Sequence, residues 1–185
     1  MSDQAVSQPK LSNKTRNYTL AMLVAIYASS HVDRQIVSIL AESIKLELML
    51  SDTQLGFLIG LSFAIFYATL GIPIAILADR YSRRNIIAIS VIVWSGMTAL
   101  CGLAGSYVQL ALARIGVGIG EAGSSPPSHS MISDLYPAEQ RATAMGIYAS
   151  GINIGVLIGF LVGGWIDQFY GWRMAFFVVG IPGII

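Results

Sequence analysis

The sequence predicts an all-α polytopic membrane protein, whose helices cross a lipid bilayer several times. Of the 185 residues, 55% are hydrophobic and 11% are charged, whereas a soluble domain usually carries about 25% charged residues. Apolar stretches of about 20 residues, the length that a helix needs to cross a bilayer, recur along the chain. The net charge is +1 and there is no long basic tract, so nothing suggests a nucleic acid as partner.

Five apolar stretches are long enough to cross the bilayer, and a sixth begins near the end of the chain. Ser51 or Asp52 can cap the second stretch by accepting hydrogen bonds from free backbone N–H groups. Pro126–Pro127 interrupts the fourth stretch. A cytoplasmic tail at 1–16 and a transmembrane bundle at 17–185 are expected, with spans at 17–40, 53–78, 85–104, 107–132, 142–166 and 172–185.

Short polar segments connect these spans. Residues 42–52, 79–84, 133–141 and 167–171 are expected to form loops outside the bilayer. The segment Ile181–Ile185 stops within an apolar run, and no polar residue closes the sixth span. We therefore expect this chain to be a fragment of a longer protein.

Basic residues indicate the orientation, because lysine and arginine gather on the cytoplasmic side of membrane proteins. With the N-terminus inside, seven basic residues fall in inner segments and two in outer segments. The inner ones are Lys10, Lys14, Arg16, Arg80, Arg83, Arg84 and Arg141, and the outer ones are Lys45 and Arg173. The N-terminus is therefore expected in the cytoplasm.

Four ionisable residues lie within the predicted spans, namely Asp33, Arg34, Arg114 and Glu121. A charge inside the bilayer is costly, so such residues usually face a partner or a water-filled cavity. At about 1.5 Å per residue, Asp33 and Arg114 both lie about 10 Å from the outer side, so an ion pair between them is reasonable. Glu121 lies two turns beyond Arg114 on the same helix face. Gly118 between them leaves room for a substrate or a neighbouring helix.

These charges suit a site that binds an anion and a proton. Arg114 stays charged and can hold a carboxylate or a phosphate through its fork of donors. Glu121 can bind and release a proton, and Asp33 can carry a proton or compete with the substrate for Arg114. Arg34 either extends to the outer surface or pairs with Glu121. The alternative is a buried ion pair that only locks the first and fourth spans together.

The sequence indicates neither a metal site nor an enzyme active site. His31 and His129 are far apart and Cys101 lies in an apolar run, so no metal-ligand spacing exists. Each histidine is expected to serve in packing. Ser128, His129 and Ser130 are adjacent on one helix and cannot converge on one point. We therefore expect no catalytic residue, no metal and no cofactor.

A charge cluster is expected where the second span meets the third. It combines one acidic residue with three arginines, and the next inner loop adds one charge of each sign. The six residues are Asp79, Arg80, Arg83, Arg84, Asp134 and Arg141. Such a network can bridge helix ends and break when the protein opens inward. Topological anchoring by positive charge is expected as well, since it requires the arginines, but it does not explain Asp79.

The fifth span carries a ridge of glycines spaced four residues apart, which are Gly151, Gly155, Gly159 and Gly163. Small residues in this spacing let membrane helices approach closely. The ridge predicts either a sliding surface or plain tight packing.

Three segments resemble motifs of the major facilitator superfamily. The run Ala75–Asn85 is similar to the superfamily's signature loop: its Asp-Arg and Arg-Arg pairs are intact, while Ala75 and Ser82 replace the usual glycines. The segment Arg114–Ala122 is similar to an Arg-x-x-x-Gly-x-Gly pattern, and Gly171–Arg173 opens the sixth span as in the family. The resemblance implies the six-helix N-terminal bundle of a major facilitator fold, with the sixth helix truncated and a C-terminal six-helix half missing.

Within the superfamily, the segments Asp33–Arg34, Gly120–Ala122 and Ser133–Pro137 look most like the spinster-like branch. That branch is linked to export of lysophospholipids or sphingoid lipids in animals and has bacterial relatives, which implies a bacterial inner (plasma) membrane. It also implies that the four charged residues within the spans form the proton-coupling and substrate site. Carriers of organic or sugar acids are a second similar branch. Gly155–Val156 lacks the Gly-Pro step of the antiporter motif, so that motif does not support antiport.

The charges and the resemblance together predict a secondary active, proton-coupled transporter that works by alternating access. Its substrate would be an anionic or amphiphilic small molecule, either lysolipid-like or an organic acid. Its partners would be the lipid bilayer, the substrate, protons and the missing half. Two alternatives remain, a non-transporting sensor or scaffold with the same fold and a small six-span carrier that dimerises.

Overall fold

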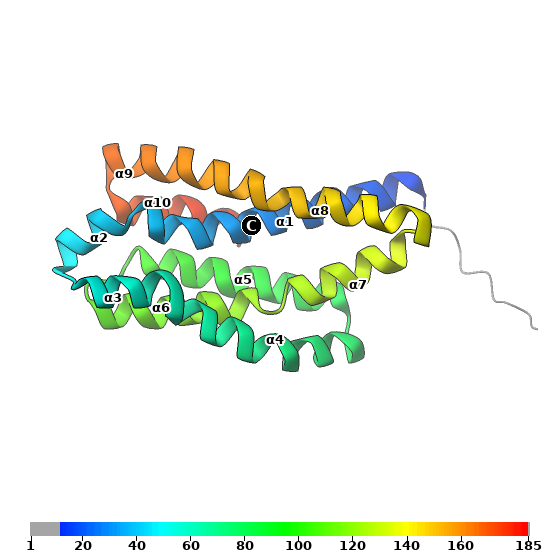
Figure 1. Ribbon diagram of the computed structural model, residues 1–185, viewed down its shortest axis with the longest axis horizontal. Coiled ribbons are helices and arrows are strands. Elements are labelled where there is room, and N and C mark those ends of the chain that lie inside the picture. The colour runs from blue at the N-terminus through cyan, green and yellow to red at the C-terminus, as the bar shows by residue number, and fades with distance from the viewer. Residues whose placement is uncertain (1–11, 185) are drawn as a thin grey trace, which may run out of the picture.

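The structure is a computed structural model and describes residues 12–184, apart from the side chains of Ala75, Ala78 and Asp79. The predicted inner residue Lys10 and the side chain of Asp79 therefore lie outside the described part. Within it, long helices run side by side along the longest axis of the molecule (Figure 1). The chain is an all-helical bundle, as the sequence predicts.

The helices of the described part follow one another with short connections. They are α1 (Asn13–Ile39), α2 (Ala41–Leu48), α3 (Asp52–Gly56), α4 (Ser62–Arg80), α5 (Arg83–Cys101), α6 (Tyr107–Glu121), α7 (Ser125–Leu135), α8 (Ala138–Ile158), α9 (Gly164–Tyr170) and α10 (Trp172–Gly180). A π-helical turn at Phe57–Leu61 joins α3 to α4, another at Gly159–Gly163 joins α8 to α9, and a 3₁₀ turn at Ile181–Gly183 follows α10.

Helices of the bundle expose apolar residues outward, as a bilayer requires. Three continuous helical stretches are long and apolar enough to cross a membrane, namely Asp52–Ile74, Arg83–Cys101 and Ala138–Tyr170. Large apolar side chains on them are open to the surroundings, with Ile72 71% exposed, Ile89 62% and Leu161 64%. In lipid such side chains face hydrocarbon, while the helix satisfies its own backbone groups.

Local signals in the sequence mark several helix ends. Ser51, not Asp52, caps α3, and its partner Gln54 bonds back to the Ser51 N–H. Such a reciprocal arrangement satisfies two free donors at once. The fourth span breaks between α6 and α7 just ahead of Pro126–Pro127, because proline is tolerated in the first turn of a helix but not in its interior. The expected interruption is therefore confirmed.

All four expected loops are largely helical instead: only Tyr81 and Ser82 separate α4 from α5, and only Gly171 separates α9 from α10. The segment predicted as a loop at 42–52 contains α2, whose Ile44 is fully buried in the core. Ser43 of α2 donates a hydrogen bond to Asp167, and Glu47 accepts one from the indole of Trp172. The segment predicted as a loop at 133–141 contains only a short break at Tyr136 and Pro137, because Pro137 starts α8 and cannot continue α7.

The apolar core is divided into two clusters. One gathers around Ile36, Leu40 and Phe176 at the end that holds α2. The other gathers around Leu20, Ile132 and Tyr148 toward the end where α7 meets α8. Buried polar side chains, among them Asp33, Arg114 and Glu121, belong to neither cluster.

The glycine ridge of the fifth span packs on α1, which runs alongside α8 in Figure 1. A Cβ atom at Gly151 would lie 3.0 Å from the Val24 carbonyl oxygen, and one at Gly155 would overlap the Ala28 carbonyl oxygen. The predicted close approach is confirmed, with α1 as the partner. On α6, a Cβ atom at Gly118 would lie 2.8 Å from the Phe63 carbonyl oxygen, so a neighbouring helix fills that space.

Candidate functional site

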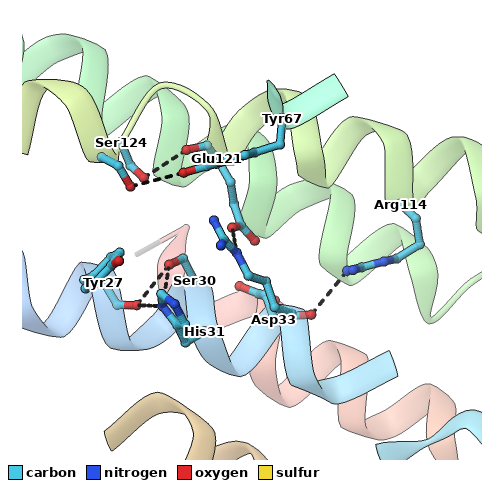
Figure 2. Close-up of polar contacts among 10 residues, drawn as sticks. Tyr27, Ser30, His31, Asp33, Tyr67, Arg114, Glu121 and Ser124 are labelled. Atoms are coloured by element: carbon cyan, nitrogen blue, oxygen red, sulfur yellow. Dashed lines mark hydrogen bonds and ion pairs between the residues drawn. The ribbon is translucent and has the colours of Figure 1, made fainter. Parts of the chain in front are cut away.

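The four charged residues predicted within the spans come together between α1 and α6. Figure 2 labels three of them, Asp33, Arg114 and Glu121. Asp33 and Glu121 are fully buried, and Arg114 is 1% exposed. Only Arg34 is partly open, with 28% of its side chain exposed. Two carboxylates and two guanidinium groups therefore share one buried region of the bundle.

Arg34 and Glu121 form the ion pair of this region. Arg34 Nε donates to Glu121 Oε2 across 2.7 Å. Of the two positions considered for Arg34, pairing with Glu121 is confirmed. The bond joins the first span to the fourth and is short, as hydrogen bonds between charged groups are.

The guanidinium group of Arg34 also contacts two aromatic rings of α4. The guanidinium carbon lies 4.8 Å from the ring centroid of Phe63 and 4.6 Å from that of Tyr67. The two rings stack on each other with centroids 5.3 Å apart. Cations over aromatic faces are attracted by the ring quadrupole. The sequence-based reasoning missed Phe63 and Tyr67, although aromatic residues four apart on one apolar helix were a signal.

The expected ion pair between Asp33 and Arg114 is wrong. Arg114 Nη1 donates to the main-chain carbonyl oxygen of Asp33 across 3.2 Å, and neither oxygen of the Asp33 carboxylate has a hydrogen-bond partner. The expectation rested on the equal depth of Asp33 and Arg114 in the bilayer. The Asp33 side chain, however, points in another direction, toward Trp94 and Thr98 of α5. Similar depth does not determine the direction of a side chain.

Several buried polar atoms in this region lack a hydrogen-bond partner. They include both carboxylate oxygens of Asp33, Oε1 of Glu121 and Nε of Arg114. Burying such groups unbonded is costly, because they give up bonds to water. Unpaired ionisable groups at this depth are typical of a site that exchanges protons or a charged ligand.

The two histidines pack against tyrosine side chains. The His31 ring meets Tyr27 edge-on with centroids 4.5 Å apart, and His31 Nδ1 lies 2.9 Å from the Tyr27 carbonyl oxygen. His129 meets Tyr148 edge-on at 5.2 Å. Tyr27 and Tyr148 stack on each other at 4.3 Å. These contacts match the expected packing role of both histidines.

The predicted charge network at the other end is formed in part. Arg83 and Asp134 make an ion pair that joins the start of α5 to the end of α7. Among the described side chains Arg141 makes no ion pair, and its Nε donates to the Tyr136 carbonyl oxygen across 3.0 Å. That carbonyl lies in the break between α7 and α8, where helical partners are lacking. The roles of Arg80 and Arg84 stay predictions.

Comparisons with known proteins point to one family. A family model described as "Major Facilitator Superfamily" matches residues 23–185. The chain is 37% identical to an "MFS-type efflux pump" of Mycolicibacterium smegmatis over 90% of this chain and 39% of that protein. It is 32% identical to a "Probable L-galactonate transporter" of Escherichia coli over 91% of this chain and 38% of that protein.

A solved structure shares the fold at higher identity. It is a bacterial homologue of the human lysosomal transporter Spinster in an inward-facing, unoccupied conformation. The TM-score is 0.87 at 42% identity, over 94% of this chain and 42% of that one. The chain thus spans about two-fifths of the length of the relatives that it matches.

Proposed function

This chain belongs to the major facilitator superfamily, and from this premise we propose that it carries the proton-coupling and substrate site of a secondary active transporter. The protein works by alternating access, in which a site near the middle of the membrane opens to one side at a time. The family places the chain among transporters and not among enzymes. The observation that supports the proton site is the buried Arg34–Glu121 pair.

A proton can open this pair. While Glu121 is ionised, it holds Arg34 by a bond that compensates for burying both charges. When Glu121 accepts a proton, the attraction is lost and the Arg34 guanidinium becomes available to another acceptor. An anionic substrate supplies such an acceptor, because a carboxylate matches the fork of guanidinium donors. Proton binding and anion binding are thereby linked at one residue pair.

The proposed substrate is an anionic or amphiphilic small molecule. Relatives with names such as "Hexuronate transporter" and "Probable L-galactonate transporter" favour an organic acid. The likeness to the Spinster homologue and to an efflux pump favours a lysolipid-like amphiphile. Substrates of both classes would bind Arg34 and Arg114 through a negatively charged group. A flux assay with one substrate of each class separates them.

The proposal includes the orientation of the protein, its membrane and the second half of the transporter. The protein spans the membrane several times, and we place its N-terminus in the cytoplasm and the bundle in the bacterial inner membrane. A second six-helix half completes the cavity, which accords with relatives of more than twice this length. The Arg83–Asp134 pair links the ends of α5 and α7, and in the proposed cycle it breaks when the cytoplasmic side opens.

The test is proton-driven flux in vesicles that contain the full-length protein, with Glu121→Gln. The substrate panel includes a lysophospholipid and a small organic acid. We expect a pH gradient to drive flux of one of them, and the variant to lose this dependence because glutamine cannot release a proton. Asp134→Asn is the comparison, and it should change the rate while the dependence on the pH gradient persists.

Other results of the flux assay would contradict the proposal. Equal pH-driven flux in the Glu121→Gln variant would make Glu121 structural and move the proton site to Asp33. Absence of flux across the whole panel would favour a sensor or scaffold that keeps the fold without transport. Flux by the 185-residue chain alone would favour a small carrier that dimerises.

A further inference from the structure

The carboxylate of Asp33 faces α5, a helix that the proposed site does not include. Its two oxygens have no hydrogen-bond partner, and the residue is fully buried. The side chains that face it from α5 are Thr98 and Trp94. Both are 0% exposed, and neither Thr98 Oγ1 nor Trp94 Nε1 has a hydrogen-bond partner of its own.

The chemistry of the three groups is complementary. An indole N–H can only donate a hydrogen bond, a hydroxyl can donate or accept, and an ionised carboxylate can only accept. Trp94 and Thr98 are four residues apart and therefore project from the same face of α5. An ionised Asp33 would satisfy both donors at once.

The two cations of the region are engaged elsewhere. Arg34 donates to Glu121, and Arg114 donates to the main-chain oxygen of Asp33. Arg114 and Glu121 of α6 still act on the Asp33 carboxylate through space, as does the thiol of Cys101 on α5. The side chains that face the carboxylate with a hydrogen-bond donor are Thr98 and Trp94 of α5.

Tight packing fixes the position of Trp94. A Cβ atom at Gly120, next to Glu121, would lie 2.6 Å from the Trp94 backbone nitrogen. Helix α5 thus lies directly against α6 at this level. The hydroxyl of Ser95, the neighbour of Trp94, faces Gly183 after α10, where an added Cβ atom would overlap Ser95 Oγ.

We propose that Trp94 and Thr98 are positioning residues of the proton site, which donate hydrogen bonds to ionised Asp33 and so bind α5 to α1. This inference rests on the proposed proton-coupled transport. On protonation, Asp33 offers an O–H, which Thr98 can accept by rotating its hydroxyl. The acceptor for Trp94 becomes a neutral carbonyl oxygen, so that hydrogen bond weakens. The contact between α1 and α5 therefore depends on the proton.

The test compares the pH dependence of flux in the full-length protein with that of Trp94→Phe and Thr98→Val. Each variant removes one donor to a charged group, so the pH at half-maximal flux should rise by about one unit or more. Thr98→Ser keeps the hydroxyl and should keep the original profile. Ser95→Ala is the matched control, since it removes a buried hydroxyl that faces away from Asp33, and its profile should not move.

A second readout does not need transport. The tryptophan fluorescence of the full-length protein should contain a pH-dependent part that disappears in Trp94→Phe and in Asp33→Asn. A flux profile that stays in place in both donor variants, or a shift that persists in an Asp33→Asn background, would overturn the inference while leaving the proposed function intact. If flux itself is absent but the fluorescence change follows Asp33, the proposed function fails and the contact stands.

Discussion

Arg34 shows how one side chain can serve both the fold and the proposed transport. It pairs with Glu121 of α6 and lies over two rings of α4, so it joins three helices by contacts of different chemistry. The ion pair depends on the protonation of Glu121, whereas the ring contacts do not. When the pair opens, Phe63 and Tyr67 can keep the guanidinium near the site, ready for an anion.

The planar shape of Arg34 is therefore expected to matter as well as its charge. Arg34→Lys keeps the charge but loses stacking on both rings, and cation–π contacts that are shielded from water contribute about 1–2 kcal/mol. The rate of flux driven by a pH gradient should fall by roughly five- to thirtyfold, because a change of about 1–2 kcal/mol corresponds to that factor. Flux equal to that of the unmodified protein would show that charge alone suffices. Lys14→Arg, at the start of α1, is a control that should not change flux.

Helix α8 packs on α1 through the glycine ridge of the fifth span. A Cβ atom added at Gly151 or Gly155 would crowd the backbone of α1, whereas one at Gly146 would meet open space. Four glycines in this spacing predicted a close contact, and the structure supplies the partner helix. Gly164, which adjoins the last of them, has open space where a Cβ atom would lie, so the ridge covers one face only.

A single methyl group should distinguish the ridge from the rest of the helix. Gly155→Ala brings a Cβ atom onto the Ala28 carbonyl oxygen, and overpacking of this kind typically costs about 1–3 kcal/mol. Thermal unfolding of the full-length protein in detergent should show a lower midpoint for Gly155→Ala and an unchanged or higher one for Gly164→Ala. Equal midpoints would mean that α1 and α8 separate easily, as a sliding surface allows.

At the scale of the whole molecule, α2 holds the ends of several helices together. Glu47 pairs with Arg173 of α10, which also donates to the Ala104 carbonyl oxygen beyond α5 across 3.0 Å. Ser43 bonds to Asp167 of α9. These contacts bring together the ends of the first, third, fifth and sixth spans.

The Glu47 contact should depend on pH. Hydrogen bonds from Arg173 and then Trp172 hold the pKa of the Glu47 carboxyl below its ordinary value. A lowered pKa stabilises the fold above the unfolded-state value, and the contribution is lost as the pH falls through the folded-state value. Because Glu47 is half exposed, the contribution is at most about 1 kcal/mol.

Glu47→Gln should therefore lower the unfolding midpoint of the full-length protein at neutral pH. The difference from the unmodified protein should shrink below pH about 4, where glutamate ordinarily takes up its proton, and vanish once Glu47 itself is protonated. Glu42→Gln, on the same helix and exposed, is the matched control and should have no effect at either pH. A Glu47→Gln effect that is equal at both pH values would assign it to packing instead of charge.

The sequence by itself determined the membrane class, the order of the helical spans, a cap at Ser51 or Asp52, the interruption at Pro126–Pro127 and the residues that bring charge into the membrane. These features depend on local composition and on the fixed rise per residue of a helix, so residues close together in the sequence are enough to predict them. The family motifs also lie in short segments, so they could be recognised without a fold.

Only the tertiary structure decided which of the charges meet. Arg34 and Glu121 are 87 residues apart, and Arg114 lies 81 residues from the carbonyl oxygen it binds. Whether α1 turns the Asp33 carboxylate toward α6 or toward α5 depends on the rotation of the packed helix, which the glycine contacts of α8 and the packing of α5 set together. A sequence shows how deep a charge lies along its helix, but the direction in which it points is a property of the assembled bundle.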